Sequence, residues 1–243
     1  MTFLSSAFWC SLPSARAIQT IAPIERRTLG ERVYTELREL LVSGRLAPGE
    51  RLSLRSAAEA LGVSIMPVRE AVSRLVAERA LEVTPNRAVR VPMMSASQFR
   101  ELAVVRVAIE GFAAEQAALK RTKQDLRTIA AADAAYKRES LSPRPDLPTA
   151  VQLNKDFHFA VYRAAGLPSL VEIIGGLWLK IGPVLNLDLR ENPERLVTGG
   201  AYRFHAEVLD AIAHQDGSRA RAALAQDITG AAAFILERGL HEH

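Results

Sequence analysis

Four side chains in the second half of the sequence have types and spacing suited to a divalent metal ion. Asn154 and His158 are four residues apart, so both side chains lie on one face if this segment is helical. His205 and Asp227 lie in two further segments of helical pattern. Two imidazoles, a carboxylate and an amide oxygen form a donor set that Zn, Ni and Mn accept, provided that three helices converge. A histidine on a helix is more often a core or surface group than a ligand, so the spacing alone leaves both interpretations open.

A second candidate site is the start of the helix in residues 62–75, GVSIMPVREAVSRL. Its apolar stripe faces inward, which leaves the side chains of its first turn outside. An exposed Ile65–Met66 pair suits thymine methyl groups or sugar edges better than water, and Arg69 can reach a guanine or a phosphate. These residues could equally belong to a packing module with solvated charges. The predicted DNA-binding residues are Ser64, Ile65, Met66 and Arg69, together with Arg55, Arg87 and Arg90.

The elements that must position this second site are three helices and a hairpin. The first helix begins near residue 31, and the glycines and proline of SGRLAPGERLS end it. Ser53 caps a short second helix that ends at Gly62, and Ser64 caps the third. A short helix, a turn and a second helix give helix-turn-helix spacing, in which the second helix suits the major groove. Two short alternating segments, 81–84 and 89–91, follow around the turn PNRA.

The metal donors lie in a body that reads as helical throughout. Beyond Ser95 the sequence is rich in Ala, Leu, Glu and Arg with helical period and has no strong strand candidate. The fold class is therefore mainly α, with a small head followed by an all-helical bundle. The predicted body helices lie near 97–120, 123–139, 149–166, 168–187, 192–214 and 217–238.

Composition narrows the class of protein. The 243 residues carry a net charge of +4, which is compatible with a polyanionic partner. The single cysteine, Cys10, excludes an internal disulfide framework and a cysteine-based zinc cluster. No apolar run is expected to be long enough to span a bilayer, and no Lys or Arg precedes the apolar start as a signal peptide requires. We therefore expect residues 1–28 to be a disordered arm and the protein to be cytoplasmic, with no membrane partner.

The head resembles that of the GntR family of transcription regulators. The similar run extends from LVSGRLAPGERLSLRSAAEALGVS through IMPVREAVSRLVAERALEV to the basic segment TPNRAVRV. The resemblance implies a winged helix-turn-helix over residues 29–94, whose third helix enters the major groove while the wing touches the minor groove. Family members commonly carry an Arg where this chain has Ile65, and a wing glycine where it has Ala88. The operator sequence is therefore expected to differ from those of family members that carry this arginine and this glycine.

The body resembles the FCD effector domain of the FadR branch of that family, which implies a ligand-binding and dimerisation domain over residues 95–239. The similar segments are VRVAIEGFAAEQAA, LNKDFHFAVYRAAG and FHAEVLDAIAHQDGSRARAAL. The resemblance implies a metal on Asn154, His158, His205 and Asp227, although many members have Asp at the first of these positions and His at the last. It also implies that Arg106 points into the same cavity, where a small organic acid would bind both it and the metal. Tyr162 and Trp178 are the further predicted effector contacts.

These observations support a homodimeric, ligand-responsive regulator that binds an operator in double-stranded DNA and represses a catabolic operon. The alternative is a metal-dependent enzyme acting on small carboxylic acids. It would leave the head without a role, and the sequence places no general base near the donors. A helical assembly scaffold with a basic head is a third interpretation. On the first hypothesis the protein is not an enzyme.

Overall fold

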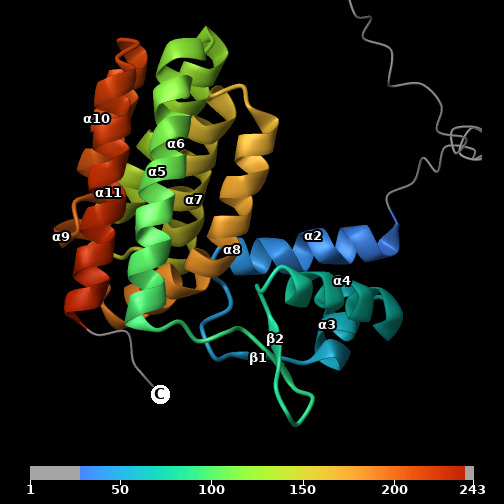
Figure 1. Ribbon diagram of the computed structural model, residues 1–243. Coiled ribbons are helices and arrows are strands. Elements are labelled where there is room, and N and C mark those ends of the chain that lie inside the picture. The colour runs from blue at the N-terminus through green and yellow to red at the C-terminus, as the bar shows by residue number, and fades with distance from the viewer. Residues whose placement is uncertain (1–27, 239–243) are drawn as a thin grey trace, which may run out of the picture.

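A computed structural model describes residues 28–238, which form a small head and a bundle of long helices (Figure 1). The bundle helices run roughly side by side, and the first helix of the head lies across one end of them. This confirms the predicted fold class, a mainly helical chain in which a winged helix-turn-helix precedes an all-helical body. The predicted disordered arm, apart from Thr28, and Cys10 lie outside the described residues.

The head contains the three predicted helices. Helix α2 (Leu29–Val42) starts at a capping box, in which the Thr28 hydroxyl accepts from the backbone N–H of Glu31 and the Glu31 carboxylate accepts from that of Thr28. Helix α3 (Leu54–Leu61) ends at Gly62, whose φ of 64° is one that glycine adopts without strain. Helix α4 (Ile65–Ala77) follows after a short turn. Of the predicted inward stripe of α4, Val68, Ala71, Val72 and Leu75 are buried, whereas Val76 is only partly buried. Pro67 is buried as well.

The hairpin is part of a sheet with one strand more than the sequence predicted. Strands β2 (Glu82–Val83) and β3 (Val89–Arg90) pair antiparallel, and β1 (Arg51–Leu52) pairs with the other edge of β3. A strand of two residues is too short to show an alternating pattern, which is why β1 escaped prediction. Because β1 follows α2 and β3 leads into the body, this small sheet ties together the two ends of the head.

Long helices build the body within the described range, and alanines bring two of them close together. Ala113, Ala114, Ala117 and Ala118 are fully buried on α5, which packs along α11. Small side chains allow two helices to approach closely, so the first and last helices of the body form its most extensive contact. The long helices are α5 (Ala96–Lys120), α6 (Lys123–Ser140), α7 (Leu147–Ala164), α8 (Pro168–Glu191), α10 (Ala201–Ala213) and α11 (Gly217–Glu237).

The single helix predicted over 192–214 is wrong, because two helices occupy this stretch. The short α9 (Arg195–Thr198) is separated from α10 by Gly199 and Gly200. Gly200 has a φ of 73°, a left-handed conformation that interrupts the helical path. The apolar period continues across the break, so periodicity alone did not reveal it.

Helix α8 also corrects the expectation that no apolar run is long enough to span a bilayer. An 18-residue window within its 24 residues reaches a mean hydropathy of 1.5, so it meets the length and composition of a span. Here 56% of that window is buried inside the protein. Helix α8 packs against α2, α5 and α7, which is the arrangement of a core helix.

The head meets the body where α2 ends against α8. A β-carbon on Gly182 of α8 would lie 2.4 Å from the backbone oxygen of Leu41. Gly44, with a φ of 66°, makes the reciprocal approach, since its β-carbon would lie 2.5 Å from the Gly182 oxygen. Lys155 of α7 adds an ion pair to Glu39 of α2. The two parts therefore touch backbone to backbone, with no space for a side chain between them.

Candidate functional site

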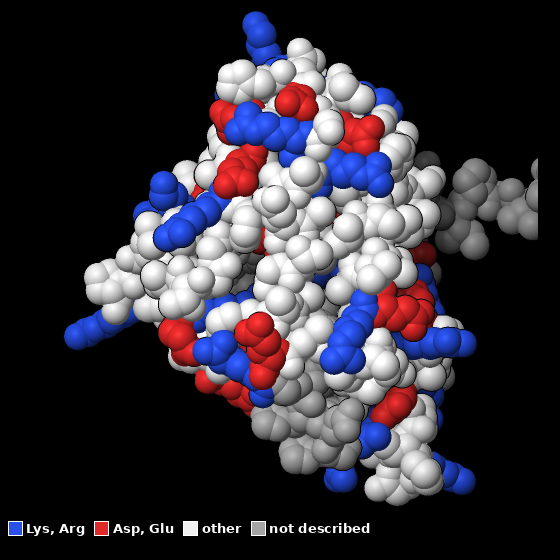
Figure 2. Space-filling view, turned by 60° about the vertical axis from the view of Figure 1, so that its left-hand side comes forward, with Lys and Arg blue, Asp and Glu red and all other residues white. Residues whose placement is uncertain are grey.

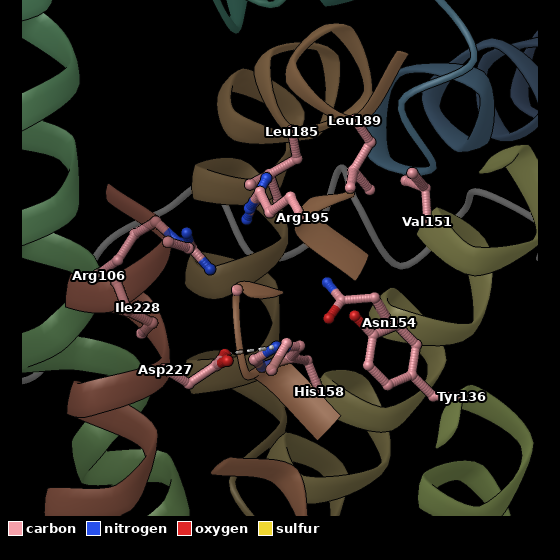
Figure 3. A pocket seen from close by; sticks show the side chains of 13 residues that line it. Arg106, Tyr136, Val151, Asn154, His158, Leu185, Leu189, Arg195, Asp227 and Ile228 are labelled. Carbon is pink, nitrogen blue, oxygen red and sulfur yellow. Dashed lines mark ion pairs between the residues drawn. The ribbon is translucent and has the colours of Figure 1, made fainter. Parts of the chain in front are cut away.

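His158, His205 and Asp227 come together inside the bundle from α7, α10 and α11. One potential ligand atom of each lies within 4.8 Å of the others. The Nε2 atom of His158 is 3.2 Å from Oδ2 of Asp227, and Nε2 of His205 is 4.0 Å from the same oxygen. Figure 3 shows His158 and Asp227 pointing toward one another. Three helices thus bring three of the four predicted metal donors together.

A chain of buried hydrogen bonds fixes the orientation of the His158 ring. The Tyr162 hydroxyl donates to Oε2 of Glu110, so its oxygen accepts from the Nδ1–H of His158 at 2.9 Å. The other ring nitrogen, Nε2, faces Oδ2 of Asp227 at 3.2 Å. A proton or a metal ion between these two atoms satisfies both of them. Metal-binding histidines commonly donate their second ring N–H in this way.

His205 is buried without a hydrogen-bond partner at either ring nitrogen within the described part of the chain. Its ring stacks on Phe157, with ring centroids 3.9 Å apart. Burial lowers the pKa of His205 to about 3 despite the opposing charge of Asp227, so the imidazole is neutral. A buried nitrogen without a partner costs about 1–3 kcal/mol, and a bound cation would remove that penalty.

Asp227 supplies the negative charge of the cluster. Burial acts to raise the pKa of its carboxyl group, but the hydrogen bond with His158 and the positive charge of Arg106 help to hold that pKa below its usual value. The carboxylate is therefore ionised. Metal ligands must be deprotonated in this way, so the residues present fit a divalent cation.

A small cavity of about 40 Å³ adjoins the cluster. Asn154, the fourth predicted donor, lies on its wall beside His158 but outside the close group of three (Figure 3). The cavity is small, so a ligand that shares it with a cation must itself be small. The cavity is lined by Arg106, Tyr136, Val151, Asn154, His158, Leu185, Leu189, Arg195, Gly199, Ala201, Asp227, Ile228 and Ala231.

Of the three predicted effector contacts, only Arg106 lines the cavity. Arg106 lines the cavity, but Glu110 already engages it with Nε–Oε1 and Nη2–Oε2 distances of 2.6 and 3.0 Å. Tyr162 and Trp178 are not among the lining residues, which departs from the prediction. Tyr162 instead holds His158, and the Trp178 ring packs 5.2 Å from that of His158. Both residues contact the ring of His158 and help to hold it in position.

One further cavity residue, Arg195, had no signal in the sequence. It lies on the short helix α9, and its guanidinium is paired with Asp188 of α8. Both side chains are nearly buried, at 11% and 6% exposure. Because the break before α10 was not predicted, neither was the turn that brings Arg195 over the cavity.

The first turn of α4 is exposed, as the sequence predicted for a DNA-binding surface. Ile65 is 41% and Met66 57% exposed, and Arg69 also faces solvent. Ser64 occupies the N-cap position, but its side chain makes no capping hydrogen bond, contrary to its predicted capping role. Its hydroxyl is thus free for another partner. Arg55 at the start of α3 has an 87% exposed side chain, 3.7 Å from Glu59.

The two predicted wing arginines differ in availability. Arg87 is exposed at the hairpin turn, where its φ is 62°. Arg90 is half-buried and forms an ion pair with Glu82 on the neighbouring strand. On the side of the molecule seen in Figure 2, positive and negative side chains are intermixed. The net charge of +4 therefore does not mark that side as a polyanion-binding surface.

The metal-free protein is expected to lose stability as the pH falls below about 6.5. The pKa of His205 is about 3 in the folded protein against an ordinary value of 6.5, so in this window the unfolded chain binds a proton that the folded one does not. Stability is complete above pH 6.5 and falls by up to about 1.4 kcal/mol for each unit below it. Urea unfolding in a chelator at pH 7.5, 6.5 and 5.5 measures this slope. A His205→Gln variant with an unchanged slope would exclude His205 as its source.

Comparison with known proteins gives consistent matches for both parts. Residues 29–91 match the bacterial regulatory proteins of the gntR family, and residues 101–230 match the FCD domain. The HTH-type transcriptional regulator McbR of Escherichia coli is 36% identical over 154 residues, which cover 63% of this chain and 69% of McbR. The E. coli HTH-type transcriptional repressor RspR is 25% identical over 202 residues, 82% of this chain and 86% of RspR.

Solved structures agree with this comparison. The structure of E. coli McbR/YncC superposes with a TM-score of 0.80 at 31% identity, and the match covers 88% of this chain and 99% of that one. The match includes both the head and the body.

Proposed function

This chain belongs to the gntR family of bacterial regulatory proteins and carries an FCD domain, and we propose that it is a ligand-responsive repressor whose effector binds beside a metal. Membership of the family makes it a DNA-binding transcription regulator rather than an enzyme. The observation that carries the proposed regulation is the buried His158–His205–Asp227 cluster with its adjoining cavity. The relative RspR is named a repressor, which supports the proposed sign of regulation.

DNA recognition is assigned to the exposed first turn of α4. With its apolar stripe buried, Ser64, Ile65, Met66 and Arg69 form the free surface of this helix. In a helix-turn-helix the corresponding turn faces base edges in the major groove. Arg55 and Arg87 would extend the contact to the phosphate backbone, whereas Arg90 is retained by Glu82.

Replacing Arg55 and Arg69 together with Ala is expected to weaken operator binding on the order of 100-fold, because each removes a charge-assisted contact to DNA. The slope of log affinity against log salt should also fall by about 0.9 for each lost phosphate contact. A gel shift over a salt series with DNA flanking the gene measures both quantities. Arg127→Ala with Arg144→Ala, two exposed arginines of the body, is the matched control. Unchanged affinity of the Arg55/Arg69 variant would exclude this surface.

The protein is proposed to act in the cytoplasm as a homodimer on a palindromic operator, since operator symmetry mirrors that of the protein. An apolar stripe on α5 supports self-association. Val104, Phe112 and Leu119 share one side of this helix and are 70%, 40% and 54% exposed. Exposed apolar side chains that recur along one helix face are typical of an interface.

His158, His205 and Asp227 would hold a divalent ion such as Zn, Ni or Mn, with Asn154 able to approach from the cavity wall. When bound, this ion would supply a Lewis-acidic site for one carboxylate oxygen of a small organic acid. Glu110 and Tyr162 keep the His158 ring in position, and Arg106 offers its remaining N–H groups to the acid. The acid changes DNA affinity only to the extent that it prefers one arrangement of the heads.

A further inference from the structure

We propose that the cavity selects a small monocarboxylate and rejects dicarboxylates, because both of its arginines are already neutralised by acids of the protein. This inference rests on the proposed function and names the class of its effector. It also identifies Asp188, which lies behind the cavity wall, as the residue that sets this selectivity.

Asp188 already pairs with the guanidinium of Arg195, the group that the second carboxylate of a dicarboxylate ligand would need. Nη1 of Arg195 donates a hydrogen bond to Oδ2 of Asp188. Nδ2 of Asn192 lies 3.4 Å from Oδ1 of the same carboxylate. Both partners of the ion pair are nearly buried. An acid that binds Arg195 must therefore compete with a carboxylate that is already desolvated and in place.

Arg106 on the opposite wall is neutralised in the same manner. Both oxygens of Glu110 accept from its guanidinium, and the pair is buried on α5. Figure 3 shows Arg106 and Arg195 entering the cavity from different sides. Each arginine can still donate to a ligand, but neither contributes an unbalanced positive charge.

The charge of the loaded site follows from these pairs. Arg106 with Glu110 and Arg195 with Asp188 sum to zero, and the two histidines are neutral when they act as ligands. A divalent cation with Asp227 then leaves one positive charge. A monoanion balances it, whereas a dianion leaves a buried negative charge without a partner, which is strongly unfavourable.

Size and polarity narrow the ligand further. The cavity of about 40 Å³ is small, which favours a short-chain acid over a long one. Away from the metal donors, the cavity is lined by the apolar side chains of Val151, Leu185 and Leu189, with Arg195 beside the two leucines (Figure 3). A carboxylate at the cluster would thus direct a short aliphatic chain toward the leucines.

Isothermal titration of the full-length, Mn-loaded protein with acetate, propionate, malonate and succinate tests this selectivity. We expect the wild type to bind propionate at least 10-fold more tightly than malonate or succinate. Asp188→Asn frees the Arg195 guanidinium and raises the net charge of the loaded site by one. It should move the malonate-to-propionate affinity ratio at least 10-fold toward malonate. Asp156→Asn, on the exposed side of α7, is the matched control and should leave the ratio unchanged.

A wild type that binds malonate or succinate more tightly than propionate, or that binds none of the four acids, overturns the proposal. So does an Asp188→Asn variant with an unaltered ratio. The wild-type ranking decides the matter even if the variant does not fold. Failure of the regulatory function has a different signature, in which propionate binds by calorimetry but leaves the operator gel shift unchanged.

Discussion

Replacing Asp227 with Asn is expected to lower the affinity for Zn²⁺ or Mn²⁺ by at least about 100-fold. The substitution removes the only carboxylate of the three-residue cluster and its negative charge, while the side chain keeps its shape. Loss of a residue that merely orients a ligand already costs about 10–100-fold, so loss of a ligand should exceed that range. Competition with a chromogenic chelator, at matched pH, measures the affinity.

Two further variants serve as comparisons for Asp227→Asn: Tyr162→Phe is an intermediate case and Glu207→Gln is the control. Tyr162→Phe removes the hydroxyl that accepts from His158, so this variant should lower the metal affinity by about 10–100-fold. Glu207→Gln removes a carboxylate from the exposed side of α10 and should leave the affinity unchanged. If Asp227→Asn bound the metal as tightly as the wild type, the cluster would not be the metal site.

Gly182→Ala is expected to destabilise the protein by about 1–3 kcal/mol and to loosen the head from the body. The new methyl group would lie 2.4 Å from the Leu41 oxygen and 2.7 Å from that of Val42, and backbone atoms cannot move aside as a side-chain end can. Urea unfolding gives the free energy, and hydrogen exchange of the α2 amides reports the loosening.

The same helix provides a matched control for this substitution. Gly176 is exposed on α8, and a β-carbon there would meet nothing within 4 Å. Gly176→Ala should therefore stabilise the protein by about 0.5–1 kcal/mol through its better helix propensity. Equal effects of the two substitutions would show that the α2–α8 contact does not hold the head.

The head was predictable from the sequence because local signals determine it. Ser53 and Gly62 delimit α3, and the apolar period of α4 identified both its buried stripe and its exposed first turn. Strand β1 was missed because its two residues carry no detectable strand pattern and its pairing with β3 is a long-range contact. The free hydroxyl of Ser64 is likewise a matter of side-chain geometry, since residue type alone favours a capping bond.

In the body, residue types predicted the His158–His205–Asp227 cluster but not its surroundings. His158 and Asp227 were identifiable by chemistry, whereas the Glu110–Tyr162–His158 chain joins residues 52 and 4 positions apart and depends on how α5 packs against α7. Arg195 and its pairing with Asp188 depend on the break at Gly199–Gly200, which the helical period conceals. Tyr162 was therefore predicted as an effector contact, whereas in the structure its hydroxyl contacts His158.

The position of Asp227 on the last helix has a consequence for biosynthesis. Helix α11 packs against α5, the first helix of the body, so this contact can form only after nearly the whole chain has left the ribosome. A nascent chain that already displays α4 still lacks Asp227, the carboxylate of the proposed metal site. On the proposed function, the capacity to sense a small molecule would thus be acquired at the end of translation, after the proposed DNA-binding residues of α4 have emerged.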